Sequence, residues 1–105
     1  MDVNSIMQQA QQMQAKLIEI QQELAKKKVE GRAGGGMVTV TVNGRGEVLS
    51  VAIEKELISP DEAQMLQDLI VAATNDGLRK AKELGRHEMN QLTGGLNLPG
   101  ISDMF

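Results

Sequence analysis

The chain has 105 residues, a formal net charge of −3 at pH 7, no cysteine, tryptophan or tyrosine, and one phenylalanine. That length predicts a single domain, and the lack of cysteine excludes a disulfide framework and a thiolate zinc site. No apolar run approaches the roughly 18 residues of a membrane span, and the N-terminus lacks the basic and apolar regions of a signal peptide. We therefore expect a soluble, cytoplasmic domain without membrane contact.

The first predicted element is a long helix whose apolar residues recur at alternating spacings of three and four, the a/d pattern of a heptad. We call these residues the heptad seam: Val3, Ile6, Ala10, Met13, Leu17, Ile20 and Leu24. The helix extends about 33 Å, whereas a strand of six residues covers only about 20 Å, so part of the seam must pack against another helix. That helix belongs either to the same chain or to a second copy.

A free monomer would expose the heptad seam to water, and self-association is the simplest way to cover it. We therefore expect a homodimer with five seam residues at its interface: Ile6, Met13, Leu17, Ile20 and Leu24.

Three lysines, Lys26 to Lys28, close the first helix, where cations favour the C-terminal end of the helix dipole. A short strand over residues 29–32 follows, and Ala33-Gly34-Gly35-Gly36 turns the chain. The glycine run is not a phosphate-binding loop, because no Lys-Ser or Lys-Thr follows it and it leads into a strand. It is typical of a turn in a three-stranded meander.

The chain is organised around an antiparallel hairpin over residues 37–54. Valines alternate with threonines over residues 38–42, and apolar residues resume the alternation over residues 49–53, the period of two of a strand. Between the strands we expect Gly44 and Gly46 to adopt positive φ. The apolar face of the hairpin predicts a platform to which both flanking helices attach.

The second helix begins at Ser59-Pro60-Asp61-Glu62, with Ser59 as N-cap and Glu62 completing a capping box. Its apolar stripe is widened in the first half by Met65, Leu69 and Ala72, enough to cover a sheet. Beyond Gly77 the stripe narrows to small residues.

The later turns of this helix carry a cationic ridge, Arg79, Lys82 and Arg86, at positions i, i+3 and i+7. The ridge either binds a ligand or is a solvated helix end that complements its dipole.

The residues for catalysis are missing. His87 is the only histidine and stands on a charged helix, which is typical of a solvated side chain. No carboxylate pair is set off from solvent, and Ser50 and Ser59 have no obvious base. We therefore expect no enzyme activity, no catalytic or metal-binding residue, no cofactor and no small-molecule substrate. Single-strand binding is disfavoured because Phe105 is the sole aromatic platform.

Basic residues are concentrated in two segments of an otherwise acidic chain. Residues 26–32 and 79–86 hold eight of the eleven basic residues and only two acids. Such clusters neutralise the phosphates of duplex DNA without reading its bases. We expect the first cluster to lie at the sheet and the second toward the tip of a helical arm. The candidate DNA-binding residues are Lys26, Lys27, Lys28, Arg32, Arg79, Lys80, Lys82 and Arg86.

Four blocks occur in an order that resembles the YbaB/EbfC nucleoid-associated proteins of bacteria. They are Met7–Gln14 (MQQAQQMQ), Ala33–Gly46 (AGGGMVTVTVNGRG), Leu66–Asp76 (LQDLIVAATND) and Thr93–Gly100 (TGGLNLPG). The resemblance implies a tweezer-like homodimer with a strand-rich centre and helical arms. It also implies a role in the nucleoid, where the protein binds duplex DNA with little sequence preference, alters its conformation and affects gene expression.

The expected fold is thus one α+β domain: a helical arm over residues 1–28, a sheet over 29–54, a second helical arm over 59–90 and a tail over 91–105. The tail is either a disordered end or a strap that docks on a partner. The competing hypothesis is a non-enzymatic protein-interaction adaptor that uses the heptad seam and the tail.

Overall fold

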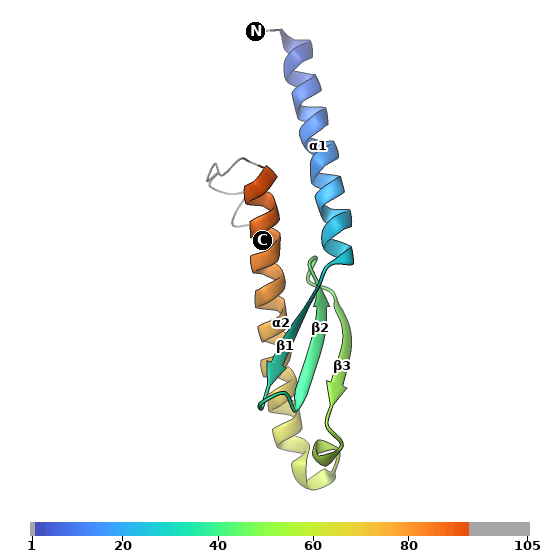
Figure 1. Ribbon diagram of the computed structural model, residues 1–105, viewed down its shortest axis with the longest axis vertical. Coiled ribbons are helices and arrows are strands. Elements are labelled where there is room, and N and C mark those ends of the chain that lie inside the picture. The colour runs from blue at the N-terminus through green and yellow to red at the C-terminus, as the bar shows by residue number, and fades with distance from the viewer. Residues whose placement is uncertain (1, 93–105) are drawn as a thin grey trace.

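The computed structural model describes residues 2–92 and has an α+β fold, with one antiparallel sheet and two long helices (Figure 1). The elements are α1 (Val3–Lys26), β1 (Lys28–Ala33), β2 (Val38–Asn43), β3 (Val48–Ile53) and α2 (Ala63–Leu92). The predicted fold class and order of elements are confirmed. Helix α2 continues two residues into the predicted tail, and the rest of that tail lies outside the described residues.

The sheet is a meander in the order β1-β2-β3, with Val40 of β2 opposite Gly31 of β1 and Val51 of β3. The three valines of β2, at positions 38, 40 and 42, are fully buried, whereas the alternating threonines are half-buried. This confirms the alternation predicted from the sequence. Helix α2 packs on the valine face over β1 and β2 (Figure 1).

Two glycines let α2 approach the sheet at backbone distance. A Cβ atom built on Gly31 would collide with the carbonyl oxygen of Ala73 and lie 2.7 Å from Cα of Gly77. A Cβ atom on Gly77 would lie 2.8 Å from Cγ2 of Val42. Small residues are therefore required on both sides where α2 crosses β1. Leu57, on a turn of 3₁₀-helix at Lys55–Leu57, completes the core and was missed by the sequence analysis.

The prediction for the β2–β3 turn is half right. Gly46 has a φ of 85°, as expected, whereas Gly44 does not have a positive φ. Gly44 is needed because α1 lies against it: its N–H donates to the carbonyl oxygens of Leu24 and Lys27 at 2.8 and 2.9 Å. A Cβ atom there would lie 2.8 Å from Cδ2 of Leu24. Glycine is therefore required at position 44 because the end of α1 approaches it closely, and not because of its backbone conformation.

The start of the second helix also differs from the prediction. Pro60–Glu62 forms a turn of 3₁₀-helix before α2, and the Ser59 side chain makes no capping hydrogen bond, so the capping box is wrong. The backbone N–H of Glu62 donates instead to the carbonyl of Ser59, at 3.1 Å. Met65 and Ala72 are exposed and do not widen the sheet-facing stripe.

The two helices attach to the sheet unequally, which corrects the expectation of one platform for both. Only the last turns of α1 reach the rest of the chain, where Leu24 is buried and Leu17 and Ile20 are half-buried. The first half of α1 extends beyond the end of α2 (Figure 1). The protein is consequently elongated, with Cα extents of 69 × 22 × 16 Å.

Strand β3 is left bare by this arrangement. Val48, Leu49 and Val51 are each nearly half exposed, and of the strand's six residues only Ile53 is even partly buried. The reason is that α2 lies over β1 and β2 and leaves the third strand uncovered.

Candidate nucleic-acid interface

The free edge of β1 is covered by polar side chains of α2. The carboxylate of Asp76 accepts a hydrogen bond from the backbone N–H of Arg32 at 3.1 Å, and Nζ of Lys80 donates to the carbonyl oxygen of Glu30 at 2.9 Å. Asp76 also pairs with Lys80 at 3.1 Å and with Arg79. The Arg32 N–H, followed by the Lys80 ammonium, holds the pKa of Asp76 below its ordinary value. Asp76 therefore ties two cations of the second basic cluster to the sheet.

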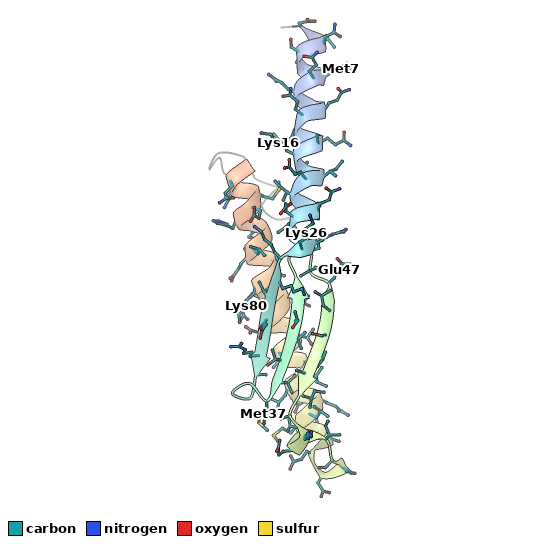
Figure 2. All side chains as sticks on the ribbon, turned by 45° about the vertical axis from the view of Figure 1, so that its right-hand side comes forward. Met7, Lys16, Lys26, Met37, Glu47 and Lys80 are labelled. Carbon is teal, nitrogen blue, oxygen red and sulfur yellow. The ribbon has the colours of Figure 1, made fainter. Side chains whose placement is uncertain are left out.

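The two basic clusters lie next to each other, which corrects their expected separation into a centre and a tip. Lys27, just after α1, pairs with Glu88 near the end of α2. Lys80 reaches the backbone of Glu30, two residues after Lys28. Figure 2 shows Lys80 beside β1 and Lys26 at the end of α1 nearest the sheet. The reason is that residues 79–86 of α2 run back along the sheet toward the end of α1.

The eight predicted cations fall into two groups by their carboxylate contacts. Four are engaged within the chain: Lys27 with Glu88, Arg32 with Glu30 at 3.0 Å, and Arg79 and Lys80 with Asp76. Lys28, Lys82 and Arg86 are exposed, and no carboxylate within residues 2–92 pairs with them; Lys26 has only a 4.0 Å contact with Glu23.

This difference decides what each cation can do. A cation without a carboxylate partner can bind a phosphate without breaking an ion pair within the protein. A paired cation must give up its carboxylate to bind the phosphate. The sequence pattern indicated the cations but not their carboxylate partners Asp76 and Glu88. Asp76 lies three and four residues before Arg79 and Lys80 on α2, a helical spacing that could have marked these pairs in the sequence. Glu88 reaches Lys27 only because α2 returns antiparallel along β1, and no local pattern encodes that contact.

Potential metal ligands are not clustered in the described part of the chain. Within residues 2–92, no group of three or more histidine, aspartate or glutamate side chains is placed to hold a metal ion. His87 is exposed, and its Nε2 lies 3.1 Å from Nε2 of Gln91. No helix of this part of the chain is long and apolar enough to cross a membrane.

Comparison with known proteins identifies the class to which this fold and basic surface belong. The model of the YbaB/EbfC DNA-binding family matches residues 1–96. The chain belongs to this family.

Curated relatives match along nearly their whole length. The chain is 59% identical over 105 residues to the nucleoid-associated protein DP1429 of Desulfotalea psychrophila, covering all of this chain and 99% of that protein. It is 52% identical to the nucleoid-associated protein Bcer98_0019 of Bacillus cytotoxicus, covering 94% and 91% of the two chains. The crystal structure of the uncharacterized protein HP0035 of Helicobacter pylori has the same fold, with a TM-score of 0.80 at 22% identity, and the match covers 89% of this chain and 98% of that one.

Proposed function

We propose that the protein is a nucleoid-associated protein that binds duplex DNA with little sequence preference and alters its conformation. The observation that carries this proposal, beyond the family, is the pair Lys82 and Arg86, exposed one turn apart on α2 without a carboxylate partner in the described part of the chain. Such cations neutralise phosphates and release counterions, a mode of binding that is independent of sequence. The adaptor hypothesis is not favoured in a family of DNA-binding proteins.

The exposed cations are the proposed primary phosphate contacts. They are Lys26, Lys28, Lys82 and Arg86. The paired cations Lys27, Arg32, Arg79 and Lys80 contribute less, because each already contacts a carboxylate. Lys80 in particular is half-buried between Asp76 and the Glu30 carbonyl, and we assign it chiefly to the β1 edge. We assign no catalytic role to any residue.

A second copy of the chain completes the proposed interface. Asp76 and Lys80 lie on the flank of α2 that faces the edge of β1. Leu78 follows Asp76 by two residues, which places it about 200° around the helix from Asp76, on the opposite flank. This opposite flank therefore borders β3, and it is apolar and exposed: Val71 is 60% and Leu78 36% accessible.

Together with the bare face of β3, this flank forms a contiguous exposed apolar surface, a feature that marks protein–protein contacts. We call it the β3–α2 surface: Val48, Leu49, Val51, Val71 and Leu78. A two-fold contact through this surface gives a homodimer, the arrangement in which the same patch serves both copies. Lys82 follows Leu78 at i+4 on the same flank, so dimerisation gathers both copies of this cation beside the contact. Arg86, one turn further, lies about 80° around the helix from Leu78, on the outer side of α2.

A gel shift with random duplex DNA tests the proposed contacts. Replacing Lys82 and Arg86 by glutamate should abolish the shift, because four favourable charges of the dimer become repulsive. The matched control replaces Arg45 and Lys55, one arginine and one lysine that are also exposed and unpaired among the described residues but lie at the two ends of β3.

The control carries the same charge change and should weaken binding only through net charge. Equal losses in both double variants would mean that overall charge and not this surface binds DNA. An unaffected shift in a folded Lys82/Arg86 variant would show that the proposed contacts are wrong.

A further inference from the structure

The exposed half of α1 carries an apolar stripe that nothing in the described part of the chain covers. Val3 is 67%, Ile6 48% and Met13 45% accessible, and Ala10 between them is exposed as well. The groove that α2 forms with α1 reaches only as far as Lys16. Residues 3–15 of α1, about 20 Å of helix, therefore carry the open part of the heptad seam.

The charges of this helical segment are arranged for contact with its own copy. Between Asp2 and Lys16 the chain has no charged side chain, so a second copy meets no repulsion along the seam. Asp2 and Lys16 have opposite signs and stand at opposite ends of the segment. Two copies in antiparallel orientation bring each Asp2 toward the Lys16 of the other copy, whereas a parallel orientation brings like charges together. Asp2 is fixed at its end because its side chain accepts from the Asn4 N–H at 3.2 Å.

The spacing of the seam fits the same orientation. In an antiparallel pair, Val3 faces Met13 of the second copy and Ile6 faces Ala10 of the second copy. Each layer then combines a larger and a smaller side chain, and all four exposed seam residues are used in both helices. The contact is isologous and closed, since residue pairs repeat under a two-fold axis.

We propose that the exposed half of α1 is a second self-association site, which pairs in antiparallel orientation with α1 of a different dimer. This inference rests on the proposed DNA-binding homodimer, in which the β3–α2 surface is already occupied. The remaining seam residues do not take part, because Leu24 is buried in its own chain and Ile20 borders α2. Joining two DNA-bound dimers in this way bridges two duplexes.

Sedimentation at rising protein concentration tests the site. The parent should pass from dimer to tetramer and, because each dimer carries two α1 helices, to larger assemblies. Ile6→Glu with Met13→Glu should remove all species larger than the dimer while leaving the dimer. The matched control, Gln8→Glu with Ala15→Glu, places the same charges at the same spacing on the opposite face of the helix and should associate like the parent. A parent that stays a dimer at high concentration, or an Ile6/Met13 variant that becomes a monomer, overturns the proposal.

Engineered cysteines test the orientation, since the protein has none of its own. A mixture of Val3→Cys and Met13→Cys chains should form a disulfide between copies, and neither variant should do so alone. A disulfide in the Val3→Cys variant alone means parallel pairing, and no disulfide in the mixture means no pairing; either result refutes the proposed contact. This test stands even if the parent proves monomeric, which would contradict the proposed dimer separately.

A bridging assay connects the contact to DNA. Immobilised duplex, saturated with protein, should capture a second labelled duplex. The Ile6/Met13 variant should lose this capture and still shift a single duplex. Capture that survives in this variant shows that bridging does not use α1.

Discussion

Replacing Gly31 with alanine tests the closest contact between α2 and the sheet. The new methyl group would collide with the backbone of Ala73 and Gly77, which cannot move aside as a flexible side chain does. Overpacking of a core costs about 1–3 kcal/mol, and backbone neighbours put this site near the upper end. Alanine also stabilises by about 0.4–1 kcal/mol because it restricts the unfolded chain, which leaves a net loss of about 2 kcal/mol.

For a domain of this size, that loss corresponds to roughly 8–16 °C in melting temperature, measured by circular dichroism at one fixed protein concentration. The control is Gly35→Ala, where a Cβ atom meets nothing within 4 Å and only the positive φ of 66° disfavours alanine. We expect that variant to lose about 1 kcal/mol or less. If Gly31→Ala melts no lower than Gly35→Ala, β1 and α2 do not touch at backbone distance and the account of the core is wrong.

Three further predictions concern the turn, the β1 edge and the charges. Gly44→Val should destabilise by about 2 kcal/mol through collision with Leu24, and an unchanged melting curve would contradict the contact. Asp76→Asn should be less stable than the parent in urea at neutral pH. Because folding lowers the pKa of Asp76, the difference should close as the pH falls from the ordinary carboxyl range through the lowered pKa. A constant difference argues against the Arg32 N–H hydrogen bond and the ion pair with Lys80. Binding of duplex DNA by the parent should show a slope of log K against log salt of about −4 to −5, since roughly four to six phosphates are neutralised, and a slope near zero excludes phosphate contacts.

The sequence predicted the elements that have a strong period. The valines of β2 and the seam of α1 follow periods of two and of alternating three and four, and both elements lie where those periods placed them. The contacts between elements were not predictable in the same way. Gly31 and Gly77 matter because they meet across 46 positions of the chain, and nothing near either residue marks the meeting.

In the candidate interface, too, local sequence predicted the residues but not the contacts between elements. Residue type and clustering found its cations, but their availability depends on carboxylates that tertiary structure brings near, such as Glu88 beside Lys27. Gly44 is an instructive intermediate case. The sequence predicted a positive φ at this glycine, whereas the structure places the end of α1 against it, so close approach and not φ is what favours glycine there.

If the first half of α1 pairs as proposed, the molecule has two activities with different responses to ionic strength. The proposed contacts of Lys82 and Arg86 with phosphates should weaken steeply as salt rises, because counterions compete for the same anions. Apolar contact along residues 3–15 contains only one opposite-charge pair at each end and changes little over the same range. A shift in cellular salt would then release the protein from DNA while leaving its copies joined.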